Sequence, residues 1–199
     1  MKKFPTISAA AIASALALAG CSAGTGSSMP GMTHDSTAAS SRSVLAAAGD
    51  HNSDDTMFAQ AMIPHHAQAV QMSDMILNKR NIPSAVTALA TKIKAAQAPE
   101  IEKMTAWLKD WNETATMSAG HSMTGMMGAD DMTKLDAAQG TEAAKLFLTQ
   151  MIAHHQGALT MAKTEATAGN NTDALALAKN IATSQEAEIQ EMNNMLAGL

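Results

Sequence analysis

An internal repeat limits the fold of this chain more than any other feature of its sequence. The segment MIPHHAQAVQM at residues 62–72 recurs 89 positions later as MIAHHQGALTM at residues 151–161, with six of eleven residues identical. Residues 89–108 and 177–196, offset by 88 positions, agree at eight of twenty. The folded part is therefore two copies of one unit.

Each unit is expected to form two helices. Apolar residues recur in steps of three and four, as in Phe58, Met62, Ala69, Met72 and Ile76, and strand signals are nearly absent. Two such hairpins predict an all-α fold, a four-helix bundle with turns near residues 81 and 169–170. The repeat halves span about 54–111 and 141–199, with a Met- and Gly-rich linker at 112–140, and residue 54 or 55 is expected to cap the first helix.

The N-terminal residues resemble an export signal. Two lysines precede an apolar run at 7–18 that is too short to span a bilayer as a folded helix, so residues 1–20 are interpreted as a signal peptide. LAGC at 18–21 resembles the lipobox of bacterial lipoproteins, which would lipidate Cys21; the alternative is a plain signal with a chance cysteine. Residues 21–53, rich in Ser, Gly, Ala and Thr, are predicted to be a disordered tether. We therefore expect a lipid-anchored protein on the outer side of a bacterial membrane.

Composition excludes several kinds of function. Cys21 is the single cysteine, so the chain has no disulfide and no site built from several thiolates. Without residues 1–20 it carries 11 Lys and Arg against 18 Asp and Glu, a formal charge of −7, which argues against a nucleic-acid partner. The sequence shows no Gly-rich phosphate loop and no Ser-His-Asp arrangement, so we do not expect an enzyme.

Polar residues interrupt all four apolar stripes at a common level. Counting from the turns places His65 level with Gln97 and His154 level with Gln185. The expected polar layer consists of His65, His66, Gln97, Glu100, His154, His155, Gln185 and Glu188. An unsatisfied buried polar group costs about 1–3 kcal/mol, so the layer must be hydrogen-bonded internally, hydrated or metal-bound. A His-Gln-Glu network that fixes helix register is the alternative to a metal site.

Methionine favours the metal interpretation. Met62 lies one helical turn before His65 and His66, and Met151 stands in the same relation to the second pair. Thioether with imidazole suits Cu(I), and Cu(II) with more His or carboxylate; zinc is less favoured because structural zinc sites rarely use Met. The candidate metal ligands are Met62, His65, His66, Met72, Met151, His154, His155 and Met161. Candidate supporting groups or additional ligands are Asp55, Gln97, Glu100, Met104, Gln185, Glu188 and Met192.

The linker carries a further set of metal-binding residue types. Residues 117–132, MSAGHSMTGMMGADDM, are Gly-rich and are not expected to be core. His121, Met123, Met126 and Met127 are therefore candidates for auxiliary, flexible metal capture. For methionines on the apolar stripes, adaptable core packing is the competing interpretation.

The paired M-I-x-H-H-x-x-A-x-x-M segments, each followed by Q-x-x-E-I-x-x-M-x-x-x-L, with GMM between them, resemble the domain-of-unknown-function family 305. The resemblance covers about residues 54–199. It implies an exported bacterial ferritin-like bundle, and some members of the family bind copper and are linked to copper tolerance. Asp55, three residues before Phe58, matches a frequent family aspartate, whereas the second half has Ala144 before Phe147 and lacks an acidic ligand there.

These observations together predict an extracytoplasmic copper-binding lipoprotein that sequesters or transfers copper. Its expected partners are the metal ion, a membrane through the lipid anchor, and a copper-handling protein. One alternative is a structural or interaction bundle on the cell surface without metal. Another is a ferroxidase-like enzyme, which would need several inward carboxylates and Glu-x-x-His pairs; no Glu precedes a His by three residues.

Overall fold

The computed structural model describes residues 51–117 and 123–199. Five helices and no strand occur in these two ranges: α1 (Ser53–Leu77), α2 (Ser84–Asp110), α3 (Ala129–Ala137), α4 (Gly140–Ala168) and α5 (Thr172–Ala197). The all-α prediction is confirmed. No helix in the described part is long and apolar enough to cross a membrane. The predicted signal peptide, Cys21, residues 21–50 of the tether and His121 lie outside the described residues.

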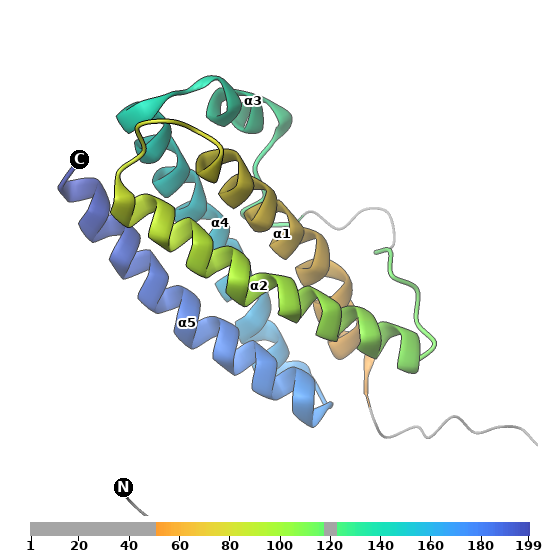
Figure 1. The fold of residues 1–199 in the computed structure, drawn as a ribbon. Helices are drawn as coiled ribbons and strands as arrows, with labels where there is room; N and C mark the ends of the chain where they lie inside the picture. The colour runs from red at the N-terminus through yellow and green to blue at the C-terminus, as the bar shows by residue number, and fades with distance from the viewer. Residues whose placement is uncertain (1–50, 118–122) are drawn as a thin grey trace, which may run out of the picture. The chain divides into compact units, whose positions relative to one another are not determined.

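The four long helices pair as the repeat predicts. Helix α1 packs along α2, helix α4 packs along α5, and the two hairpins meet where α1 packs against α4. Figure 1 shows the four running alongside one another, with α3 outside them near the start of α4. The polar layer therefore lies between two hairpins of similar construction.

Helix α3 was not predicted, because the linker was interpreted as irregular. Its nine residues are too few to show an apolar stripe, and a helix this short depends on packing for its stability. Leu135 supplies that packing, because it is fully buried. Asp130 and Asp131 lie in the first turn, where their negative charge interacts favourably with the positive end of the helix dipole. The bundle accordingly has a fifth, accessory helix.

The helix ends explain where the hairpins turn. Asn81, between α1 and α2, has a φ of 59°, in the left-handed region that Asn tolerates. Between α4 and α5, Gly169 ends the first helix and the side chain of Asn171 caps the next. The expected cap at residue 54 or 55 is wrong by two or three positions. Asn52 caps α1, and its backbone N–H donates to Asp55 Oδ2 at 2.6 Å, which completes a capping box.

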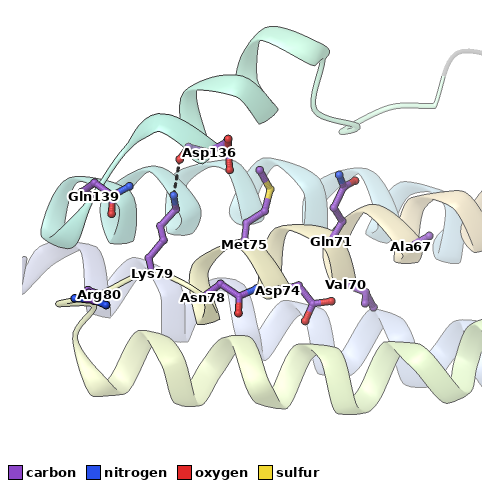
Figure 2. A pocket seen from close by; sticks show the side chains of 10 residues that line it. All are labelled: Ala67, Val70, Gln71, Asp74, Met75, Asn78, Lys79, Arg80, Asp136 and Gln139. Carbon is purple, nitrogen blue, oxygen red and sulfur yellow. Dashed lines mark hydrogen bonds between the residues drawn. The ribbon is translucent and has the colours of Figure 1, made fainter.

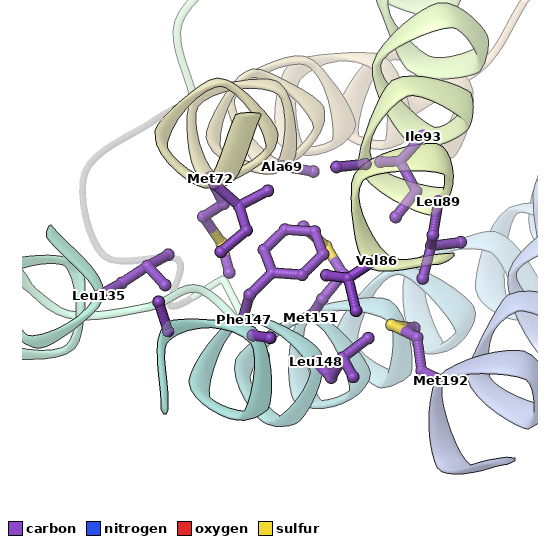
Figure 3. Close-up of a cluster of buried hydrophobic side chains, with 14 residues drawn as sticks. Ala69, Met72, Val86, Leu89, Ile93, Leu135, Phe147, Leu148, Met151 and Met192 are labelled. Carbon is purple, nitrogen blue, oxygen red and sulfur yellow. The ribbon is translucent and has the colours of Figure 1, made fainter. Parts of the chain in front are cut away.

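The apolar core is divided into two clusters. The Phe147 cluster draws on the C-terminal half of α1 and the N-terminal half of α4, and Figure 3 shows Met72, Met151 and Val86 around the ring of Phe147. The Phe58 cluster draws on the opposite halves of the same helices and includes Met62. Between the clusters, each long helix contributes polar residues instead of apolar ones.

Candidate metal centre

The polar layer predicted from the sequence lies between the two core clusters. All four histidines are fully buried, Gln97 and Gln185 are each 3% exposed, and Glu188 is 4% exposed. Glu100 is partly buried. Counting residues from the turns was sufficient to find this level because the turns lie at the predicted places, between Leu77 and Ser84 and between Ala168 and Thr172.

The centre of the layer is a pair of closely packed imidazoles from α1 and α4. The ring centroids of His65 and His154 lie 3.7 Å apart, with the ring planes tilted by 40°. His65 Nε2 lies 3.3 Å from the carbonyl oxygen of Thr124. A carbonyl oxygen only accepts hydrogen bonds, so Nε2 carries the hydrogen and Nδ1 keeps its lone pair. His154 has no hydrogen-bond partner for either ring nitrogen among the described residues.

The other two histidines each bind a glutamate within their own hairpin. His66 Nε2 donates to Glu100 Oε2 at 2.7 Å, and His155 Nε2 donates to Glu188 Oε2 at 2.8 Å. These equivalent bonds orient both imidazoles and place the hydrogen on Nε2, so that Nδ1 is again left with a free lone pair. Lys92, 3.6 Å from Glu188 Oε1, also contacts this carboxylate from α2.

Burial keeps three of the layer histidines, His65, His154 and His155, neutral. Burial, together with the charge that neighbouring histidines would carry, lowers the pKa of His65 to about 4 and that of His154 to about 2. Burial also lowers the pKa of His155, although Glu188 opposes this shift. Near neutral pH these imidazoles therefore present lone pairs and no charge, which is the state that binds metal.

Protein groups alone do not satisfy the layer. Nδ1 of all four histidines, both amide atoms of Gln97 and the Gln185 oxygen are buried and have no hydrogen-bond partner in the described part of the chain. Each such atom costs about 1–3 kcal/mol if it stays unpaired. A self-contained His-Gln-Glu network is therefore not formed, and a bound ion or water is needed.

Two buried methionines border each side of the polar layer. Met62 and Met104 lie in the Phe58 cluster, and Met151 and Met192 lie in the Phe147 cluster. Met62 is separated from His65, and Met151 from His154, by one helical turn. All four methionine side chains are fully buried. Thioethers are thus available above and below the imidazoles.

Two of the predicted ligands lie farther away. Met72 and Met161 follow the second histidine of each pair by six residues, about 9 Å along a helix axis. Met72 is buried within the Phe147 cluster, and Met161 lines a surface pocket. The structure therefore does not bring these two methionines into the polar layer.

The donor set is unlike that of a zinc site. In the described ranges, no three side chains among His, Cys, Asp and Glu are grouped so that they could hold a metal ion. An ion held in the layer would therefore combine imidazole with thioether. This mixed set matches the preferences of copper better than those of zinc.

Asp55 has a structural place at the end of the bundle, away from the polar layer. Its Oδ1 accepts from the backbone N–H of Asn170 at 3.1 Å and of Asn171 at 2.9 Å, which ties α1 to the turn between α4 and α5. Burial raises its pKa, but these bonds and one with Glu165 outweigh that effect and lower it. Asp55 is therefore a carboxylate that organises this end of the bundle.

Glu165 is a buried acid that the sequence interpretation missed. It is 1% exposed, and burial together with the Asp55 carboxylate raises its pKa to about 8. Glu165 therefore holds a proton near neutral pH and shares it with Asp55. The signal was available, because steps of three and four continue the α4 stripe from Met151 through Ala158 and Ala162 to Glu165.

The last part of the linker closes over the polar layer. Gly125, with a φ of 86°, lies against Gly157 of α4, where an added Cβ would collide with the carbonyl oxygen of Thr124. The side chain of Gln68 binds both backbone groups of Met127, at 2.7 and 2.9 Å. Of the capture residues, Met123, Met126 and Met127 are thus partly buried against the bundle.

One surface hollow is unrelated to this layer. It has a volume of about 760 Å³ and lies beside the C-terminal half of α1. Figure 2 shows Lys79 reaching across it to the carbonyl oxygen of Asp136, at 2.6 Å. None of the candidate ligands lines it.

Comparison with known proteins identifies the family. The family described as "Domain of unknown function (DUF305)" matches residues 55–196. This chain belongs to the DUF305 family. No curated protein matches it. Among solved structures, a DUF305 protein from Streptomyces coelicolor is 32% identical, with a TM-score of 0.69, and the match covers 73% of this chain and 93% of that one.

Further similar structures include one solved with metal bound. A DUF305 fragment from Deinococcus radiodurans is 29% identical, with a TM-score of 0.68, covering 74% of this chain and 98% of that one. CopM in its Cu(I)-bound form is 30% identical, with a TM-score of 0.61, covering 72% of this chain and 96% of that one. CopM has also been solved with Cu(II) and with Ag bound.

Proposed function

We propose that this DUF305 protein binds copper, chiefly Cu(I), in the polar layer, and that it sequesters copper or hands it on outside the cytoplasm. One observation carries the proposal. Four buried imidazoles with unpartnered Nδ1 atoms lie between two pairs of buried methionines. Neutral imidazole and thioether donors together favour copper over harder ions.

The proposed ligands are a subset of the predicted ones. They are Met62, His65, His66, Met151, His154 and His155. Glu100 and Glu188 orient imidazoles, and Gln97 and Gln185 face the same layer as further donors. Copper-bound structures of CopM, at 30–31% identity, support the choice of metal.

The proposed location is the bacterial cell envelope. The signal-like residues 1–20, the lipobox at Cys21 and the tether support export and lipid anchoring. The Streptomyces coelicolor relative is described as a secreted protein, which agrees with this location. A copper-handling protein is the proposed partner for transfer.

A competition titration against a chromophoric Cu(I) chelator tests the proposal. We would compare the chain from residue 22 with a variant in which His65, His66, His154 and His155 are all replaced by Leu, after confirming that both are helical by circular dichroism. We expect the wild type to bind Cu(I) tightly and the fourfold variant to lose this tightest binding, whether or not a weaker thioether site elsewhere still takes up an ion. Equal affinity in both proteins would overturn the proposal.

Parallel titrations separate the alternatives. Zn(II) should bind more weakly than Cu(I), because the layer lacks three grouped hard ligands in the described residues. A structural or interaction bundle without metal would show no uptake of any ion, and only its thermal stability would change in the fourfold variant. Oxygen consumption on addition of Fe(II) would instead indicate a ferroxidase.

A further inference from the structure

A second group of methionines surrounds a pocket at the surface, outside the polar layer. The pocket has a volume of about 190 Å³, and its lining includes Met57, Met117, Met123 and Met161. We call it the methionine pocket. Met57 is 41% exposed, and it is the one large hydrophobic side chain so exposed in the described part of the molecule. Core packing does not explain four thioethers around one opening.

Acidic groups complete the lining. Asp54 and Glu165 lie in the wall of the methionine pocket, and its described lining contains no Lys, Arg or His. Glu165 is 1% exposed, and apart from Asp55 no described side chain or backbone group offers its carboxyl oxygens a hydrogen bond. An apolar ligand in this pocket would leave the buried carboxyl without a polar partner, which is unfavourable, whereas a cation would be attracted to it.

We propose that the methionine pocket is a second metal site, which holds a soft monovalent cation of the Cu(I) or Ag(I) class. Met57, Met123 and Met161 supply thioether sulfur, and the Glu165 carboxyl, which is protonated near neutral pH in the metal-free protein, supplies negative charge by releasing its proton to solvent when the cation binds. Thioethers select such ions over hard divalent cations. Methionine has an unbranched side chain with three rotatable bonds, which allows the sulfurs to converge on an ion.

The methionine pocket adjoins the polar layer at Thr124. Thr124 lines the pocket, and its carbonyl oxygen accepts the hydrogen bond from His65 Nε2 at 3.3 Å. An ion captured at the surface would therefore lie next to the linker segment that closes over the histidines. Passage of that ion to His65 rests on the proposed function, whereas binding in the methionine pocket does not.

Titration with Ag(I), followed by NMR of ¹³C-methyl-labelled methionine, tests this site in the chain from residue 22. The test variant is Met57→Leu/Met161→Leu, which nearly preserves side-chain volume and removes two sulfurs. Met75→Leu is the matched control, because Met75 lies on α1 outside the methionine pocket. The methyl signals of Met57, Met123 and Met161 should shift together, and the double variant should bind one ion fewer per chain than the wild type and the control.

Two further variants make the outcome decisive. Glu165→Gln keeps every sulfur and should weaken Ag(I) binding at the pocket by about tenfold or more, which tests the site even if the double variant folds poorly. The fourfold histidine variant should still bind one ion with the same methionine shifts, even if the polar layer binds none. Unshifted pocket methionines, or an equal number of ions in the wild type and the double variant, would overturn the proposal.

Discussion

The four layer histidines differ in what holds each ring. Glutamates orient His66 and His155, a linker carbonyl orients His65, and His154 has no hydrogen-bond partner among the described residues. The sequence predicted which residues meet, because helical spacing and turn positions determine their level. It did not predict which ring nitrogen faces the interior, because that depends on partners from α2, α5 and the linker.

His154→Leu is expected to separate metal binding from stability. The substitution removes two unpartnered buried nitrogens, so the metal-free protein should keep its free energy of unfolding or gain about 1 kcal/mol. Cu(I) affinity should fall at least about tenfold. Urea unfolding and chelator competition measure the two quantities, and His51→Leu, at the stacked His51–Trp111 pair, is the control that should leave affinity unchanged. Large destabilisation with unaltered affinity would indicate a structural histidine.

Glu188→Ala tests the orientation of His155. Loss of the carboxylate leaves Nε2 without its 2.8 Å partner, so the ring and its tautomer are no longer fixed. Cu(I) affinity should fall by about 10–100-fold, the usual effect of removing such a group. Glu191→Ala removes a carboxylate that also contacts Lys92, at 3.1 Å, but does not bind His155, so it should have no effect. Equal losses in both variants would argue against an orienting role.

The elements show where sequence prediction succeeded and where it failed. The four long helices were predicted because their apolar stripes recur in both halves of the repeat. The structure of the linker was not predicted, because it depends on contacts with residues far away in the sequence. Leu135 is buried in the core, Gln68 binds the backbone of Met127, and Thr124 lies against Gly157. A single copy of a Gly- and Met-rich segment has no periodicity that would reveal such contacts.

Gly157→Ala should displace the linker from the bundle. The added Cβ would collide with the carbonyl oxygen of Thr124, so the free energy of unfolding should fall by about 1–3 kcal/mol despite the better helix propensity of Ala. Cleavage by a protease between residues 117 and 128 should become faster. Gly128→Ala, whose Cβ would meet only an Asp131 side-chain oxygen at 4.0 Å, is the control. Equal protease resistance in all three proteins would show that the linker does not depend on this contact.

Across the whole bundle, the buried histidines and Glu165 change the free energy of unfolding in opposite directions as the pH rises. His65 and His154 have lowered pKa values, so the metal-free bundle should lose stability as the pH falls below the ordinary histidine value of 6.5. Burial and Asp55 raise the pKa of Glu165 to about 8. The stability that its protonated form contributes is therefore complete below pH 4.5 and is lost as the pH rises towards 8. Both groups were buried by the same assembly of hairpins.

Glu165→Gln should isolate the contribution of the carboxyl pair. We compare the free energies of unfolding of the metal-free variant and the metal-free wild type. Between pH 5 and pH 8 their difference should shift in favour of the variant by more than about 1.4 kcal/mol, which is the equivalent of one pKa unit. Urea unfolding at the two pH values measures this difference. Glu186→Gln, at a surface carboxylate 3.0 Å from Lys163, should follow the wild-type profile. Parallel profiles for Glu165→Gln and the wild type would contradict the shared proton.

Anomalous diffraction at the copper edge, from crystals loaded with Cu(I), would show whether copper binds in the polar layer. We predict a copper peak between α1 and α4, within bonding distance of Nδ1 of a layer histidine and of the sulfur of Met62 or Met151. A further peak in the methionine pocket would be compatible with this result. Copper confined to the surface, with all four buried imidazoles unliganded, would contradict it.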